Sequence, residues 1–448
     1  MRTGKIAITM AAAGVLLPLG TLAAQAGTGG QPPPPGVVSA TPAANTPRLA
    51  STSSPREQIR QLVQCGGTMY AVGSFAAIKQ GSRTYARTDI VSFRATAPYT
   101  VTSWAPRVSG SIKTDQDGAA AVNSIAFNGG NCADAYIGGN FSKVNGTRVR
   151  DIAEISTTTG NVITGFAHNA NGRVDTLAAV RGHLLAGGTF TSINGAKPAR
   201  MASLNPSTGR GDGFLNLSIR GSQVYNQQVS HGGRRDLVEG VFSSAGGVTR
   251  HQIFMLSLRG SRAMVTGWTS RDFAAACTES FWARAAAWSP NDSTVYVATT
   301  GFHLVGGANG GTRSGPCDAA LAYPATEAPV AHTWVNYTGC DSLYSVAADS
   351  RAAYFGGHER YSMNPSACNA LGPGGYNAPG LEGLNPASGA LFINSSGSAG
   401  YYSRARGLGA DGMLLTGAGL WIASDNFDDS DTCGGVSGHA GICFLPYS

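Results

Sequence analysis

The chain repeats itself, and this repeat limits its fold more than any other feature of the sequence. The stretch Tyr136–Gly146 matches Leu185–Gly195 almost residue for residue, and both contain Gly-Gly, then Phe, then Asn-Gly. Weaker copies lie around residues 75, 242, 302, 358 and 427, which gives seven copies at intervals of about 59 residues. A recurring period of this kind indicates an array of similar supersecondary units.

Each unit contains four short strand-like runs separated by Gly, Asn-Gly or Pro. We expect the order aromatic run (162–166), apolar run (174–180), Gly-Gly run (185–190) and Ala-x-Leu run (201–205). Seven such units predict an all-β fold, a seven-bladed β-propeller of four-stranded antiparallel blades, as one domain over residues 59–448. An open solenoid is the competing repeat architecture, but it favours shorter periods and polar caps.

The repeat also gives a role to the Gly content, which is 62 of 448 residues. That share is about twice the usual roughly 7%, and without a Gly-X-Y period it excludes collagen and disfavours helical bundles. We expect the Gly pairs to permit close backbone contact where blades converge, and the following Phe to fill the gap between blades.

The repeated pattern Gly-Gly-x-Phe-(Ser/Thr)-x-(Val/Ile)-Asn-Gly, followed by Ala-x-(Ile/Leu) and a Thr-Gly turn, resembles the delta-sixty repeat of secreted bacterial propellers. Units two and three carry the pattern well. Units one and four keep Gly73-Ser74-Phe75 and Gly240-Val241-Phe242, while units five to seven are supported mainly by spacing. The resemblance implies a β-propeller, and it transfers no catalytic residue.

The N-terminal region predicts export. Arg2 and Lys5 precede an apolar run, and a small-x-small pattern ends at Ala26, so residues 1–26 are predicted to be a signal peptide cleaved after Ala26. Residues 27–58 are rich in Pro, Ala, Ser and Thr and are expected to be an extended, disordered linker. We expect a secreted monomer with no membrane insertion. Scattered Arg residues and few Lys residues argue against nucleic-acid binding.

Eight cysteines in an exported chain predict four disulfides, although counting alone allows 105 pairings. In an antiparallel blade, alternate loops lie on the same face, so each cysteine was placed on a face by the run it adjoins. Nearest neighbours on one face then give the predicted pairs, which are Cys65 with Cys132, Cys277 with Cys317, Cys340 with Cys368, and Cys433 with Cys443.

The candidate site residues lie in the long loops of units five to seven, which share one face in the predicted order. Loops held by disulfides on a rigid scaffold are frequent binding sites. The predicted binding residues are His303, His358, Glu359, Arg360, Tyr361, Tyr376 and His439. An acidic cluster formed by Asp425, Asp428, Asp429 and Asp431 is a candidate calcium site, and a solvated acidic loop is the alternative. We expect no other cofactor.

No catalytic signature with a serine elbow, zinc helix or phosphate loop is present. The sequence therefore predicts a non-enzymatic binding module for an extracellular carbohydrate, cell-wall polymer or protein. The alternative is a glycan-active hydrolase or lyase that uses Asp425, Asp428, Glu359 or His358 on the same face as acid and base. No motif supports a copper enzyme of the galactose-oxidase type.

Overall fold

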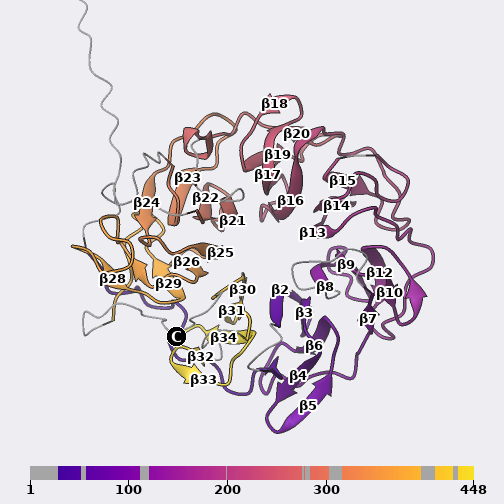
Figure 1. Ribbon diagram of the computed structural model, residues 1–448, viewed down its shortest axis with the longest axis horizontal. Helices are drawn as coiled ribbons and strands as arrows, with labels where there is room; N and C mark the ends of the chain where they lie inside the picture. The colour runs from indigo at the N-terminus through magenta and orange to yellow at the C-terminus, as the bar shows by residue number, and fades with distance from the viewer. Residues whose placement is uncertain are drawn as a thin grey trace, which may run out of the picture.

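The computed structural model consists of β-strands and one short 3-10 helix, η1 (Arg271–Ala274), within the residues that it describes. These are residues 29–51, 57–110, 121–197, 199–274, 277, 283–301, 315–394, 409–426 and 432–448. The sheets stand radially around a common axis, as Figure 1 shows. The predicted all-β propeller class is therefore confirmed.

Seven sheets among the described residues share one plan, and we call them blades one to seven in chain order. In each, an innermost strand, a middle strand and a third strand pair antiparallel as a meander. These strands are, in blade one, β2 (Gln58–Cys65), β3 (Thr68–Ser74) and β6 (Ile90–Arg94); in blade two, β8 (Ala121–Ala126), β9 (Asp134–Asn140) and β12 (Ile152–Ser156); in blade three, β13 (Val174–Val180), β14 (His183–Gly188) and β15 (Met201–Leu204); in blade four, β16 (Ile219–Val229), β17 (Arg235–Ala245) and β19 (Ile253–Ser257); in blade five, β21 (Ala283–Trp288), β22 (Thr294–Thr299) and β23 (Ala319–Pro324); in blade six, β25 (Leu343–Ala348), β26 (Ala353–Gly357) and β29 (Leu381–Leu384); and in blade seven, β30 (Gly412–Thr416), β31 (Gly419–Ala423) and β34 (Ile442–Pro446).

The aromatic runs form the outer edge of the blade that precedes them, which differs from the expected strand order. Two of them are strands, β20 (Met264–Val265) on β19 and β24 (Trp334–Tyr337) on β23. In blade two the outer edge is reduced to a single bridge between Ile155 and Val162. The reason is a turn after the third strand that folds the next run back onto that strand; in blades two and three this turn contains Thr159-Gly160 and Thr208-Gly209. The assignment of loops to the two faces is unchanged.

The connections between middle and third strands carry small strands of their own. Two-stranded hairpins occur there in blades one, two, six and seven. The remaining strands are β1 (Arg48–Leu49), β4 (Ala77–Gln80), β5 (Arg83–Ala86), β7 (Val108–Ser109), β10 (Lys143–Val144), β11 (Thr147–Arg148), β18 (Val248–Thr249), β27 (Tyr361–Ser362), β28 (Tyr376–Asn377), β32 (Thr432–Cys433) and β33 (Val436–Ser437).

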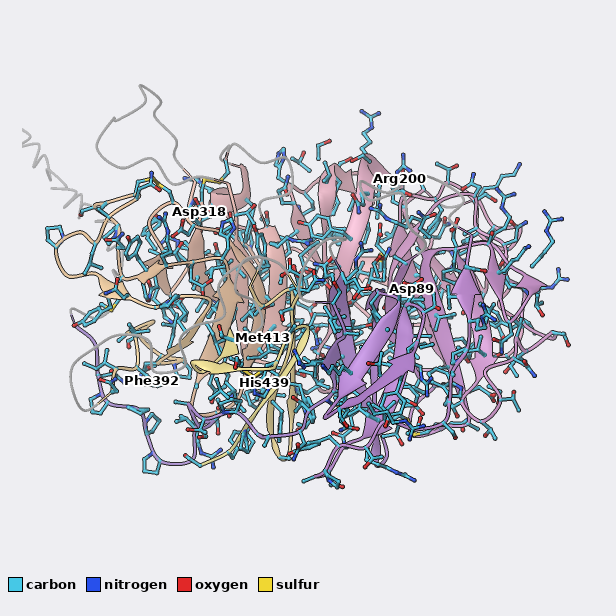
Figure 2. The ribbon with its side chains drawn as sticks, turned by 60° about the horizontal axis from the view of Figure 1, so that its bottom comes forward. Asp89, Arg200, Asp318, Phe392, Met413 and His439 are labelled. Carbon is cyan, nitrogen blue, oxygen red and sulfur yellow. A yellow bond between two sulfur atoms is a disulfide. The ribbon has the colours of Figure 1, made fainter. Side chains whose placement is uncertain are left out.

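The residue directly before each third strand has a positive φ angle in all seven blades. These residues are Asp89, Asp151, Arg200, Gln252, Asp318, Gly380 and Gly441. They lie where third strands begin, and innermost strands begin on the same face, which we call the start face. Asp318 and Arg200 accordingly lie along the same side of the disc in Figure 2. This recurrence shows that the repeat persists in the backbone where the sequence has diverged.

The N-terminal segment is ordered against the propeller, which differs from the expected disordered linker. Val38 forms an antiparallel bridge with Tyr447, and the Ser39 amide donates to the Pro446 carbonyl at 2.7 Å. Val37 and Val38 are buried. The Pro-rich composition predicts extended backbone correctly, but an open sheet edge on blade seven supplies hydrogen bonds and apolar contacts that composition does not reveal.

The core consists of apolar layers between neighbouring blades. Between blades seven and one, Trp421 stacks on Phe444 with ring centroids 4.3 Å apart, and Phe93 packs against the same indole. Gln58 of β2 bridges to Asp425, which follows β31, so the first and last blades also meet through backbone. The ring is thus closed by blade packing near the axis and by the N-terminal segment at the rim.

Candidate functional site: the axial cavity

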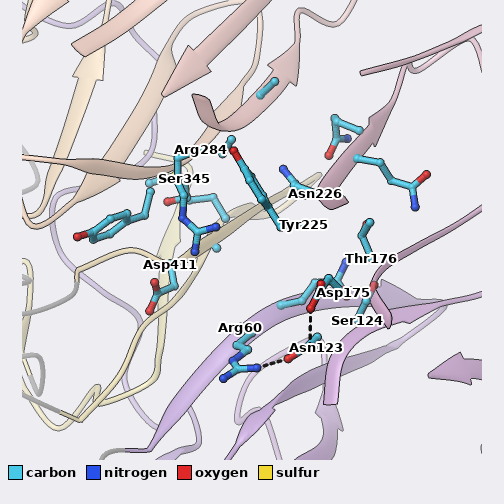
Figure 3. Close-up of a pocket in the computed structure, with 18 of the residues that line it drawn as sticks. Arg60, Asn123, Ser124, Asp175, Thr176, Tyr225, Asn226, Arg284, Ser345 and Asp411 are labelled. Atoms are coloured by element: carbon cyan, nitrogen blue, oxygen red, sulfur yellow. Dashed lines mark hydrogen bonds between the residues drawn. The ribbon is translucent and has the colours of Figure 1, made fainter. Parts of the chain in front are cut away.

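A polar cavity of about 560 Å³ lies on the propeller axis, where innermost strands of all seven blades meet (Figure 3). Six of these strands contain a register shift, so that one extra residue is present opposite the middle strand. A bulge of this kind re-aims a side chain. The residues at these shifts, which we call the bulge residues, are Arg60, Asn123, Asp175, Tyr225, Arg284 and Tyr344, and all six line the cavity.

The Gly pairs of the repeat are linked to these bulges. At Gly139 a Cβ atom would lie 2.1 Å from the Ala121 carbonyl oxygen, and at Gly188 it would lie 2.1 Å from the Arg173 carbonyl oxygen. At Gly73, Gly240 and Gly357 a Cβ atom would lie 1.9 to 2.3 Å from a carbonyl oxygen in or directly before the innermost strand. In each case that carbonyl belongs to the residue two positions before the bulge residue. The second Gly of the repeat therefore makes room for the bulge that directs a side chain into the cavity.

A chain of hydrogen bonds runs along the cavity wall from blade seven to blade four. Gln58 donates to Asp411, Arg60 donates to both Gln58 and Asn123, and the Asn123 amide donates to Asp175 Oδ1 at 3.1 Å. Figure 3 draws the links among Arg60, Asn123 and Asp175. The chain holds these planar polar groups in fixed orientations.

Asp175 is the most heavily bonded group of this chain. The Arg173 Nε atom lies 2.5 Å from Asp175 Oδ1, and Gln223 Nε2 donates to Asp175 Oδ2 at 3.0 Å. Burial raises the pKa of Asp175, and the Arg173 charge opposes that shift. Burial also raises the pKa of Asp411 to about 7, against the hydrogen bond from Gln58 and the charge of Arg284. Asp411 therefore changes its charge near neutral pH.

The opposite part of the wall, formed by blades four to six, has a different character. The Arg284 guanidinium carbon lies 5.4 Å from the Tyr225 ring centroid and 6.0 Å from that of Tyr344. The Tyr344 hydroxyl is 3.2 Å from His358 Nδ1. Within the described residues, Arg284 has these aromatic contacts and no hydrogen-bond or ion-pair partner.

The predicted binding residues of blade six lie beside the cavity or behind its wall. His358 contacts Tyr344, and burial lowers its pKa. Glu359 is 1% exposed, and burial together with the neighbouring Glu382 raises its pKa. Among these residues, therefore, His358 adjoins a bulge residue, while Glu359 lies in the protein interior.

Arg360, Tyr361 and Tyr376 are engaged in contacts within the fold. Arg360 forms two 2.8 Å hydrogen bonds to the carboxylate of Asp341, which follows Cys340, and it lies 5.3 Å from the Tyr361 ring centroid. The Tyr376 hydroxyl accepts a 2.9 Å hydrogen bond from the Gly30 amide. These three side chains fix the loop of blade six and the N-terminal segment.

The predicted residues of blade seven are buried where the structure describes them. His439 is 5% exposed and its Nδ1 atom is 3.1 Å from Thr46 Oγ1, which joins the blade to the N-terminal segment. Asp425 is fully buried and close enough to raise the pKa of Asp411. His303, Asp428, Asp429 and Asp431, together with the predicted signal peptide, lie outside the described residues.

The four disulfides join the predicted pairs. Cys65–Cys132 links blades one and two with Cα atoms 5.7 Å apart, on the face opposite the start face. Cys277–Cys317, Cys340–Cys368 and Cys433–Cys443 all lie on the start face of blades five to seven. Because the bulge residues are near the beginnings of innermost strands, the cavity wall that they form lies toward this same face.

The described residues contain neither a metal-binding cluster nor a membrane-spanning helix. No group of three or more His, Cys, Asp or Glu side chains is arranged to hold a metal ion there. Nor does that part of the chain contain a helix of the length and apolarity needed to cross a membrane.

The bulge residues are not among the site residues predicted from the sequence. Each directly follows an apolar residue within the run that became the innermost strand, as in Ile59-Arg60 and Val174-Asp175. The sequence signal for these residues was a polar or aromatic residue that interrupts each apolar run directly after an apolar residue. Its meaning depends on the bulge, which a single strand does not reveal.

The comparisons with known proteins agree with the fold. No family model and no curated protein sequence matches the chain. Solved structures do match: U3-55K has a TM-score of 0.51 and the RRP9 WD40 repeats a TM-score of 0.50. Each is 9% identical, with 91% of this chain and 100% of the other chain covered. At this identity the likeness shows the fold alone, so we conclude that the chain folds as a β-propeller.

Proposed function

We propose that this protein is an exported binding module that takes a carbohydrate or cell-wall polymer in the axial cavity, entered from the start face. The cavity volume of about 560 Å³ is within the range of roughly 300 to 1,000 Å³ usual for ligand sites. Its wall is formed largely by amide, guanidinium, carboxyl and hydroxyl groups. Export is supported by the predicted signal peptide and by four disulfides with no free cysteine.

The observation that carries this proposal is the hydrogen-bond chain from Asp411 through Arg60 and Asn123 to Asp175. Planar groups held in fixed orientations bind hydroxyl groups without losing much rotamer entropy on binding. Two tyrosines, Tyr225 and Tyr344, add aromatic surface to the same cavity. A protein partner is favoured less, because apolar anchor residues dominate the centres of such interfaces.

A carbohydrate microarray with the purified full chain tests the proposal, followed by calorimetric titration of the glycans that bind. We expect Asn123→Ala to weaken binding roughly tenfold, because it removes a donor and an acceptor from the wall. Asn128→Ala is the matched control, because Asn128 is exposed and away from the cavity. Absence of binding to every glycan, or equal weakening by both variants, would contradict the proposal.

Hydrolysis of the bound glycan is the second candidate, favoured by the two carboxyl groups in the cavity. Asp175 and Asp411 both have raised pKa values, and glycoside hydrolysis needs one protonated and one ionised carboxyl group. They replace Asp425 and Glu359, two of the four predicted acid and base candidates, which are buried. Release of new reducing ends by the protein, lost in Asp411→Asn, would favour hydrolysis over binding alone.

A further inference from the structure

The hydrogen-bond chain of the cavity wall does not extend around the whole ring, and Arg284 lies in the part of the wall that the chain does not reach. The chain covers blades seven, one, two, three and four. Blades five and six contribute Arg284 and Tyr344, which are not part of it. In Figure 3 the Arg284 side chain extends from β21 into the space between Asp411 and Tyr225.

The guanidinium of Arg284 differs from those of the other two cavity arginines. Arg173 is paired with Asp175, and Arg60 donates to Gln58 and Asn123. Arg284 instead lies near two tyrosine rings, which limit its position through cation–π contacts but leave its N–H donors without a polar partner in the described part of the chain. It is therefore a positioned fork of donors facing a cavity.

The charges of the wall favour an anion at this position. The lining side chains that can carry a charge near neutral pH are three arginines and two aspartates. Asp175 is neutralised by its contact with Arg173. Asp411 is the one carboxylate left to oppose Arg60 and Arg284, and it accepts a hydrogen bond from Gln58. Two guanidinium charges against one carboxylate leave a net positive charge on this side of the cavity.

We propose that Arg284 is the anion-binding residue of the cavity, and that the ligand is an acidic glycan whose carboxylate or sulfate group pairs with this guanidinium. This inference rests on the proposed function and names the ligand class of the same site. A guanidinium fork matches the two oxygens of an oxyanion and forms charge-assisted hydrogen bonds stronger than neutral ones. The amides of the wall then remain for the hydroxyl groups of the sugar.

A matched pair of trisaccharides tests the proposal by calorimetric titration of the full chain at pH 7 and low salt. Trigalacturonate carries a carboxylate where galactotriose carries a hydroxymethyl group. We expect trigalacturonate to bind at least about tenfold more tightly, and we expect Arg284→Gln to remove that preference. A sulfated galactan oligomer in a parallel titration shows whether carboxylate or sulfate is preferred.

Two further variants make the result specific. Arg83→Gln is the matched control, because Arg83 also lies over a tyrosine ring, 4.7 Å from the Tyr85 centroid, but on the exposed surface. It should keep the preference. Arg284→Lys keeps the charge without the fork and should keep part of the preference. Thermal melting of each variant verifies folding, and added salt should weaken trigalacturonate binding to the native chain.

The contrary outcomes are distinct. Equal affinity for both trisaccharides, or a preference that survives in Arg284→Gln, would refute the assignment of Arg284 and leave the glycan module in place. Failure of every sugar to bind would refute both proposals. Hexaglutamate bound as tightly as trigalacturonate, with the same loss in Arg284→Gln, would show that the ligand is an acidic peptide rather than a glycan.

Discussion

Blades one to four and blades six and seven place different residues at the same position of the repeat. Two residues after the second Gly of the repeat, the first four blades carry a buried Phe, as at Phe141 and Phe190. Blade six has the buried Glu359 there, and the strand register of blade seven places Asn426 there. Three of the four disulfides lie in blades five to seven. Where the apolar contact of the repeat has been lost, covalent links hold the loops.

The two regions also differ at the cavity. Blade seven and blades one to four share one continuous hydrogen-bond chain, whereas Arg284 of blade five and Tyr344 of blade six are not part of it. Blades one to four, together with Asp411 of blade seven, thus supply a fixed wall, and Arg284 of blade five supplies the donor that remains available to a ligand. Under the proposed function, the donor available to a ligand comes from a blade whose sequence has departed from the repeat.

The largest expected effect on stability comes from replacing the residue that lies two positions after the second Gly of the repeat. Phe141→Ala should lower the free energy of unfolding by about 3 to 5 kcal/mol, because a fully buried ring leaves a cavity between blades. Glu359→Gln in blade six should cost much less, because it removes no apolar contact. Chemical denaturation of both variants measures the difference, and similar losses at the two positions would erase the distinction between the regions.

The same glutamine variant has a pH signature. Because burial raises the pKa of Glu359 above that of the unfolded chain, the native state holds an extra proton between these two values. Stability of the native chain should therefore fall as pH rises through the interval above about 4.5, the ordinary pKa of a Glu carboxyl. Glu359→Gln does not titrate, so its stability should fall less steeply over that interval. An unchanged slope in the variant would show that Glu359 does not carry the effect.

Disulfide removal should rank the two regions by loop length. Cys65 and Cys132 are 67 residues apart, and their replacement by Ala should cost about 4 kcal/mol by the chain-entropy relation. Cys433 and Cys443 are 10 residues apart, and the same relation gives about 2.7 kcal/mol. Melting temperatures of the two double-Ala variants test this order. A reversed order would mean that the blade-seven disulfide restrains more than its own loop.

The smallest effect concerns the Gly that makes room for a bulge. Gly188→Ala should cost about 1 to 3 kcal/mol, because its Cβ would lie 2.1 Å from the Arg173 carbonyl oxygen. It should also weaken glycan binding, because Asp175 is positioned by that bulge. Gly165→Ala, where a Cβ meets open space, is the control and should change neither property. Weaker stability with unchanged binding would separate the bulge from the site.

Much of the architecture could be predicted from local sequence signals. The seven copies of the Gly-Gly motif indicated the propeller, and face assignment of the cysteines gave the four pairs found, such as Cys65–Cys132. Both predictions depend on the number of residues between motifs within one blade or between adjacent blades. The placement of the aromatic runs was wrong because it depends on whether a turn folds a run backward or forward.

The loops predicted to bind a ligand and the axial cavity lie toward the same face, but the residues that line the cavity are different ones. Arg360 and Tyr376 have the chemistry of binding residues, yet their side chains are engaged with Asp341 and the Gly30 amide. Arg284 directly follows an apolar residue, as the other bulge residues do, but this position alone does not show that its side chain enters a cavity. Its exposure to the cavity results from the bulge in β21 and from the tyrosines of neighbouring blades.

The sequence by itself determined the repeat, the β-propeller class and the disulfide pairs, because each depends on short-range periodicity that chain geometry translates directly. Only the tertiary structure decided that the N-terminal segment closes blade seven and that the bulge residues meet on the axis. Each blade directs at most a few side chains to that axis, and their neighbours come from strands about 50 to 60 residues away. A cavity assembled from seven separate strands has no contiguous sequence signal, because its groups become neighbours only when the ring closes.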